Sequence, residues 1–97
     1  MVYTVEEIKN KTGKIARQYE VGRMSLFGSY ARGEATENSD VDFLIERGGI
    51  QDLFRYFAFV EDLEEALGCH VDVVMESAQD QDFVREIRKE GILVYEA

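Results

Sequence analysis

Two short motifs with chemically useful side chains lie close together in this chain. Gly28 and Ser29 come first, and Asp40 and Asp42 follow after a gap of ten residues. A glycine next to a serine can bring backbone N–H groups and a hydroxyl close to a phosphate. Two carboxylates separated by one residue can bind a divalent cation, because Mg²⁺ prefers oxygen ligands. The two motifs together predict a site for a metal and a phosphorylated ligand, and nucleotide transfer from ATP is the leading hypothesis.

The two aspartates are predicted to lie on a strand over residues 40–46. Side chains two residues apart on a strand point the same way, so Asp40 and Asp42 should share a face, with Cα atoms about 6.6 Å apart. Val41 and Phe43 then face the core and hold the pair on a rigid element. Two carboxylates placed in this way can converge on one Mg²⁺ or share two ions.

A third acid and a basic residue are further candidates for the site. Asp72 interrupts an apolar run over residues 71–74, where it could bind metal or act as the base for an attacking hydroxyl. Arg32 could balance phosphate charge, or it could hold its loop to the sheet. Cys69 and His70 lie at the start of the predicted third strand, and such residues more often have no catalytic part.

Length and composition limit the classes of protein that are possible. The chain has 97 residues, 45% of them hydrophobic, which predicts one folded domain over residues 1–97. A formal charge of −9 argues against direct nucleic-acid binding and is compatible with a basic protein partner. One cysteine excludes an internal disulfide and a four-cysteine zinc site. Without a signal peptide or a long apolar run, we expect no membrane association and a cytoplasmic location.

The hydrophobic periodicity predicts alternating helices and strands. This order implies the α/β (α+β) class, with a small sheet covered by helices. Helices are predicted over residues 5–20, 51–67 and 79–90, a short helix or turn over 29–33, and strands over 21–27, 40–46, 70–75 and 92–95.

The predicted helix over residues 51–67 is unusually rich in aromatic residues. Its helical stripe runs from Leu53 to Leu67 and includes Phe54, Phe57, Val60 and Leu63. The aromatic residues at positions 54, 56, 57 and 59 cannot all occupy one helix face. Some of them should therefore be exposed, or buried against a partner.

Residues 28–35 together with residues 39–42 resemble the signature of the minimal nucleotidyltransferases, within the DNA-polymerase-β-like nucleotidyltransferase superfamily. The ending over residues 91–96 is also typical of the small members, so the resemblance covers about residues 21–96. It implies the nucleotidyltransferase fold with a mixed sheet flanked by helices, ATP as donor and two Mg²⁺ ions. Gly28 and Ser29 would then bind phosphate, Asp40 and Asp42 would bind metal, and Asp72 would be the third acid.

The resemblance also implies a partner. Small bacterial and archaeal members of this kind are MntA-like antitoxins, which pair with HEPN-type ribonuclease toxins and transfer AMP from ATP to a toxin tyrosine. A hetero-oligomer with a toxin is the corresponding expectation. Two alternatives stay open, namely an antitoxin that neutralises by binding alone, and a transferase that modifies a small molecule of the aminoglycoside type. Cys69 and His70 depart from the more ordinary basic or polar pair that the family pattern leads us to expect there.

Overall fold

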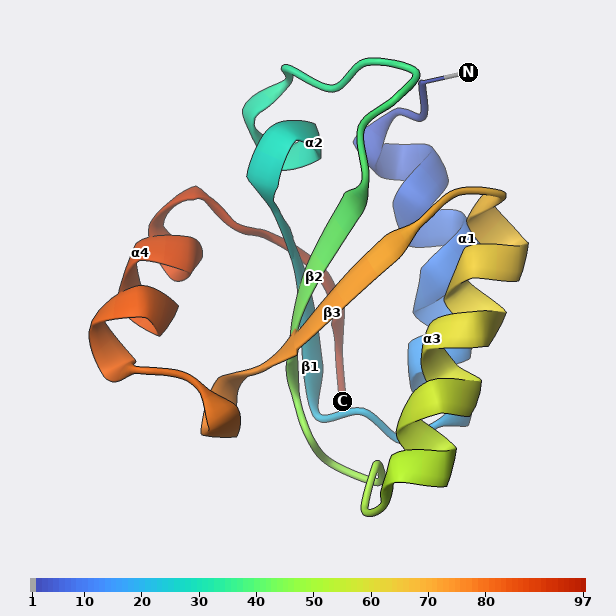
Figure 1. The fold of residues 1–97 in the computed structure, drawn as a ribbon, viewed down its shortest axis with the longest axis vertical. Helices are drawn as coiled ribbons and strands as arrows, with labels where there is room; N and C mark the ends of the chain where they lie inside the picture. The colour runs from blue at the N-terminus through green and yellow to red at the C-terminus, as the bar shows by residue number, and fades with distance from the viewer. Residues whose placement is uncertain (1) are drawn as a thin grey trace.

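The computed structural model describes residues 2–97, and its helices and strands alternate in the predicted order (Figure 1). Most boundaries differ from the predicted ones by one or two residues, and a short 3₁₀ turn that was not predicted follows the third strand. The elements are α1 Val5–Gln18, β1 Arg23–Phe27, α2 Gly28–Arg32, β2 Val41–Glu46, α3 Leu53–Leu67, β3 Val71–Met75, η1 Glu76–Ala78, α4 Gln81–Glu90 and β4 Ile92–Glu96.

Side-chain caps explain where the helices begin. Thr4 and Glu7 form a reciprocal capping box at the start of α1. The carboxylate of Asp52 accepts a hydrogen bond from the Arg55 N–H at 2.8 Å, so α3 begins at Leu53 and not at residue 51. Asp80 caps α4 in the same way, which moves its start to Gln81.

The four strands form one mixed sheet in the order β3-β2-β1-β4. β1 pairs antiparallel with both β2 and β4, whereas β2 and β3 are parallel. The parallel pair places Val41 opposite Val71 and Asp42 opposite Asp72. The expectation of a mixed sheet flanked by helices is therefore confirmed, and β3 occupies one edge of the sheet.

Helices cover both faces of the sheet. α1 and α3 lie on one face and α4 on the other, with α2 at the end of β1 (Figure 1). Val41, Phe43 and Ile45 of β2 pack into the larger core beneath α1 and α3. Leu44, which points the opposite way, packs with Val84 and Ile87 of α4 in a smaller core. Asp42 alternates with Phe43 and therefore lies on the α4 side of the sheet.

The buried face of α3 includes only part of its apolar residues. Phe59, Leu63 and Leu67 are buried, whereas Phe54 and Phe57 are 87% and 61% exposed. Two apolar stripes overlap on this helix, and the sequence does not say which one meets the sheet. The expectation that some of the aromatic residues of this helix are exposed is therefore confirmed, and its first two turns present aromatic side chains to solvent.

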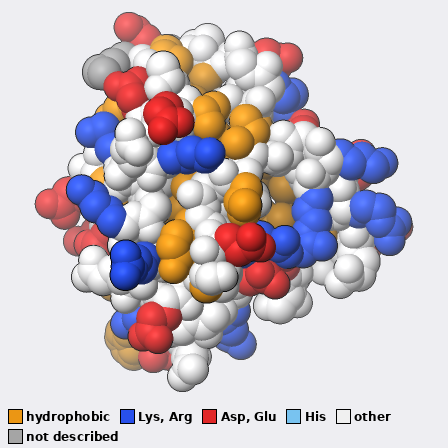
Figure 2. Space-filling view, turned by 180° about the vertical axis from the view of Figure 1, so that it is seen from behind, with side chains coloured by type: hydrophobic (Ala, Val, Ile, Leu, Met, Phe, Trp, Pro, Cys, Tyr) orange, Lys and Arg blue, Asp and Glu red, His pale blue; other side chains and the backbone are white. Residues whose placement is uncertain are grey.

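The surface carries charges of both signs. The face opposite to the view of Figure 1 shows Lys and Arg side chains among acidic and hydrophobic ones (Figure 2). None of the helices within residues 2–97 combines the length and the apolar character that a membrane crossing requires.

Candidate active site

Asp42 and Asp72 meet at the centre of the candidate site. They are direct partners in the parallel pairing of β2 and β3, so their side chains project from the same face of the sheet. Asp42 is half-buried, whereas the Asp72 side chain is 51% exposed at the sheet edge. The structure therefore brings together two of the three predicted acids. Asp72 therefore lies on an edge strand of the sheet and next to Asp42.

Asp40 and His70 complete the cluster at the start of the two strands. Asp40 precedes β2 and is not part of the strand, contrary to the prediction of a strand from residue 40. The Val41 N–H donates a hydrogen bond to the His70 carbonyl at 3.1 Å and holds the two strand entries together. As a result, one ligand atom each from Asp40, His70 and Asp72 lie within 4.8 Å of one another.

His70 contacts two carboxylates. Its Nε2 lies 3.0 Å from Asp72 Oδ1, and its Nδ1 lies 3.1 Å from Glu64 Oε2. The hydrogen bond and the charge of Asp72 are the largest causes that raise the pKa of His70. Sequence reasoning did not predict these contacts: Asp72 is only two residues further along the chain, and Glu64 comes from the preceding helix α3. The departure from the family pattern at this position was the available signal.

The charges of the cluster and burial together raise the pKa of Asp42. Burial is the largest cause that raises its pKa to about 6 from an ordinary 3.8, followed by the charge of Asp72 and a hydrogen bond with it, then by the charge of Asp40. Arg32 acts in the opposite direction but does not cancel these effects. Such crowding of negative charge is typical of sites that bind cations.

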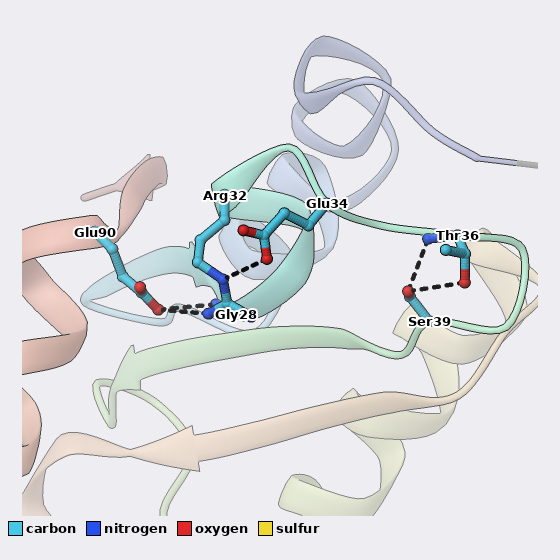
Figure 3. A network of polar contacts seen from close by, with 6 residues as sticks. All are labelled: Gly28, Arg32, Glu34, Thr36, Ser39 and Glu90. Carbon is cyan, nitrogen blue, oxygen red and sulfur yellow. Dashed lines mark hydrogen bonds and ion pairs between the residues drawn. The ribbon is translucent and has the colours of Figure 1, made fainter.

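A loop that is held by its own internal hydrogen bonds places Asp40 in the cluster. Ser39 Oγ accepts a hydrogen bond from the Thr36 N–H at 2.8 Å (Figure 3). The Ser39 N–H in turn donates to the Thr36 carbonyl at 3.1 Å. Thr36 Oγ1 also accepts from the Asn38 N–H at 3.3 Å. These bonds tie the tip of the loop to its own backbone immediately before Asp40.

Gly28 lies where α2 leaves β1, against the Asp42 side chain. Its φ of 72° is in the left-handed region, and a Cβ added there would be 2.3 Å from Asp42 Oδ2. Only glycine allows this backbone turn and this close approach at the same time. Ser29 follows in the first turn of α2 and is half-buried. Phosphate binding by Gly28 and Ser29 stays a prediction, and the geometry places both beside the acids.

Arg32 is held by two carboxylates. Its Nε lies 3.2 Å from Glu34 Oε2, and its Nη1 lies 3.4 Å from Glu90 Oε1 (Figure 3). The same Glu90 oxygen accepts a hydrogen bond from the Gly28 N–H at 3.3 Å. Sequence reasoning missed Glu90, because it ends α4 more than fifty residues away and nothing in its local sequence sets it apart.

A groove with a volume of about 490 Å³ opens next to the acids. Asp42 and Asp72 line one part of it, and the rest is mostly aromatic and aliphatic. The apolar lining comes from β1, β3, α3 and α4, namely Phe27, Tyr56, Phe57, Val60, Val71, Val73, Val74 and Phe83.

The residues present fit a divalent metal. Asp40, Asp72 and His70 each offer a ligand atom to one cluster, and Asp42 lies opposite Asp72. Carboxylate oxygens are the donors that Mg²⁺ prefers. Burial is the largest cause of the raised Asp42 pKa, and the charges of Asp72 and Asp40 add to it; a bound cation would relieve this repulsion.

Comparison with known proteins identifies the family of this chain. The polymerase β nucleotidyltransferase family model matches residues 10–97. The protein adenylyltransferase MntA of Thermococcus cleftensis is 35% identical over 95 residues, covering 94% of this chain and 96% of that protein. The chain therefore belongs to the polymerase β nucleotidyltransferase family, and it is a nucleotidyltransferase of the minimal type that its motifs predicted.

Solved structures share the fold. One that is described as a candidate minimal nucleotidyltransferase superposes with a TM-score of 0.80 at 28% identity, covering 93% of this chain and 95% of that chain. Another is described as a tri-AMPylated Shewanella oneidensis HEPN toxin in complex with MNT antitoxin. It superposes with a TM-score of 0.73 at 20% identity, covering 97% of this chain and 74% of that chain. At that identity the second likeness is one of fold.

Proposed function

We propose that this chain transfers AMP from ATP to a hydroxyl of a partner protein. The observation that carries the proposal is the arrangement of the three acids. Asp42 lies against the Gly28 turn and opposite Asp72, both line a groove, and Asp40 lies in one cluster with Asp72. In this reaction the acceptor oxygen forms a bond to the α-phosphorus, the bond from that phosphorus to the bridging oxygen breaks, and pyrophosphate leaves with the electron pair. The acceptor proton goes to a base on the protein.

The residues have separate roles in the proposal. Asp40 and Asp42 hold divalent metal, which when bound supplies charge neutralisation for the phosphates. Gly28 and Ser29 offer backbone and hydroxyl donors to the phosphates, and Arg32 balances their charge. Asp72 faces the groove from the sheet edge, where it can also accept the acceptor proton.

The apolar groove favours a protein acceptor. An aminoglycoside is a polycation and needs many acidic or polar contacts, whereas this groove has two carboxylates and otherwise mostly apolar walls. Leu53, Phe54 and Phe57 are exposed on the adjoining turns of α3, at 69%, 87% and 61%. Such a cluster is typical of a protein-binding surface. An aromatic hydroxyl such as that of tyrosine matches both the apolar walls and the acids at the end of the groove.

A HEPN-type ribonuclease toxin is the proposed partner, with this chain as its antitoxin in a cytoplasmic hetero-oligomer. The name of the Thermococcus cleftensis relative and the description of the Shewanella oneidensis complex support this assignment. The formal charge of −9 is compatible with a basic partner.

Labelled ATP tests the proposal directly. The chain is incubated with Mg²⁺, ATP labelled at the α-phosphate and the product of the neighbouring gene, and transfer is read as label on that product. Asp42→Ala should abolish the label, whereas Asp82→Ala, which removes an exposed carboxylate from α4, should not. The proposal is wrong if wild type and Asp42→Ala leave the partner equally unlabelled.

The exposed aromatic surface of α3 favours a second candidate, in which the chain neutralises its partner by binding alone. In that case Asp40→Ala and Asp42→Ala should protect cells from the toxin as well as wild type does. Loss of protection by variants that still bind the toxin in a pull-down would reject this candidate and support catalysis.

A further inference from the structure

The carboxylate of Glu90 lies on the donors that a nucleotide phosphate would use. One oxygen, Oε1, accepts from the Gly28 N–H at 3.3 Å and lies 3.4 Å from Arg32 Nη1 (Figure 3). A phosphate oxygen bound at this turn would have the same charge, the same acceptor character and the same two partners. Glu90 therefore imitates one phosphate oxygen from within the chain.

The position of Glu90 in the fold allows its side chain to move away from Gly28 and Arg32. It is the last residue of α4, and its side chain is 37% exposed. Gly91 follows it directly and donates its N–H to the Ile87 carbonyl at 2.8 Å, so the backbone at the helix end is fixed without the Glu90 side chain. The contacts that Glu90 makes are long, at 3.3 and 3.4 Å, and are the kind that a better acceptor can replace.

Arg32 does not depend on Glu90 for its place. It also pairs with Glu34 at 3.2 Å through a different nitrogen, Nε. When Glu90 leaves, Arg32 therefore keeps one partner and has Nη1 available for a phosphate. The pairing with Glu34 argues that Glu90 competes with the ligand and is not needed to position the guanidinium.

We propose that Glu90 sets the affinity of this chain for its nucleotide, because its carboxylate occupies the Gly28 and Arg32 donors until the triphosphate displaces it. This inference rests on the proposed function, since it takes ATP as the donor. It adds a determinant of nucleotide affinity on α4, outside the Gly-Ser and Asp-x-Asp motifs.

Nucleotide binding by charge-matched variants tests the inference. Binding of AMP-PNP with Mg²⁺ is measured by calorimetry for wild type, Glu90→Gln and Glu90→Ala. Glu86→Gln is the control, because Glu86 is exposed on the same helix, pairs with Lys89 and carries the same charge. Both Glu90 variants should bind about tenfold tighter, a change that corresponds to about 1.4 kcal/mol. Glu86→Gln should stay within about twofold of wild type, which is the scatter expected for a remote surface charge.

Two further measurements test whether Glu90 competes with a phosphate oxygen for the Gly28 and Arg32 donors. Inorganic tripolyphosphate should show the same gain in affinity, because the proposed competitor is a phosphate oxygen and not the base. In an Arg32→Ala background, Glu90→Gln should gain less, since one of the two shared donors is gone. A gain limited to AMP-PNP, or one that is unchanged without Arg32, would overturn the inference.

The outcomes separate this inference from the proposed function. If wild type and Glu90→Gln bind AMP-PNP equally, or if Glu90→Gln binds more weakly, the inference is wrong and nucleotide transfer still stands. If no variant binds AMP-PNP or tripolyphosphate, both are wrong. Thermal melts of each variant confirm that the compared proteins are folded at the temperature of the titration.

Discussion

Asp42 and Asp72 lie directly opposite each other on the parallel strands β2 and β3. Parallel strands keep such a pair on one face, and the closeness of the two carboxylates contributes to the raised pKa of Asp42. Without a cation, the folded chain therefore holds two acids near each other at a cost in stability. This is the pattern of a functional site that trades stability for activity.

The first prediction follows from that cost. Asp42→Asn should raise the stability of the metal-free protein at pH 7.5, because the substitution removes the charge that burial and Asp72 disfavour. The pKa rises from 3.8 to about 6, but solvent reaches this half-buried group and screens its charge, so the expected gain is about 1 kcal/mol. For a domain of this size that is a rise in Tm of about 4–8 °C.

The pH dependence of this gain has a definite sign. A carboxyl with a raised pKa in the folded state stabilises the protein only while it is protonated. That stability is present below about pH 4 and is lost as the pH rises from about 4 to about 6. The advantage of Asp42→Asn over wild type should therefore vanish near pH 4. Asp82→Asn, which removes an exposed carboxylate, should show no such dependence. Equal melting curves for Asp42→Asn and wild type at pH 7.5 would contradict the prediction.

Divalent-metal binding should depend on pH through the same group. Asp42 must lose its proton before it can bind a cation, so the affinity for Mn²⁺, used as a spectroscopic probe in electron paramagnetic resonance, should rise through about pH 6. Saturating Mg²⁺ should raise the Tm, and EDTA should reverse this rise. In Asp42→Asn the midpoint near pH 6 should be absent. A midpoint that persists in this variant would assign the titration to another group.

His70 provides a separate probe, because it is the only histidine in the chain. Its ring contacts Asp72 and Glu64, and the Asp72 contact is the main reason that its pKa is raised from 6.5. Its ring protons in an NMR titration should therefore give a midpoint above pH 6.5 in the metal-free wild type. Asp72→Asn should lower the midpoint toward that value, whereas Asp82→Asn should leave it unchanged. A midpoint that does not respond to Asp72→Asn would mean that the two side chains are apart in solution.

Local sequence was sufficient for the elements but not for the contacts between them. The capping box at Thr4 and the Gly28-Ser29 strand end could be identified because their signals lie within a few residues. The opposition of Asp42 and Asp72 requires the pairing and register of two strands that are thirty residues apart, which no local pattern specifies. The contact of Glu90 with Gly28 is even harder to predict from local sequence, because it depends on how α4 packs on the sheet.

The two glycines at the ends of α2 both have left-handed backbone conformations and offer a matched pair for the last prediction. Gly28 and Gly33 have φ values of 72° and 74°, so an alanine at either position should cost about 1 kcal/mol in backbone strain. Their surroundings differ, however. A Cβ at Gly33 meets nothing within 4 Å, whereas a Cβ at Gly28 falls 2.3 Å from Asp42 Oδ2.

Gly28→Ala should therefore displace the Asp42 carboxylate, while Gly33→Ala should leave it in place. Both variants should lose similar stability in urea denaturation, because the end of the Asp42 side chain can swing away from the new methyl group. Only Gly28→Ala should lose Mn²⁺ affinity and AMP transfer, each by about tenfold or more, the loss expected when a metal ligand is misplaced. If Gly33→Ala loses metal binding as severely as Gly28→Ala, the effect comes from the backbone of α2. The close approach of Gly28 to Asp42 then does not build the site.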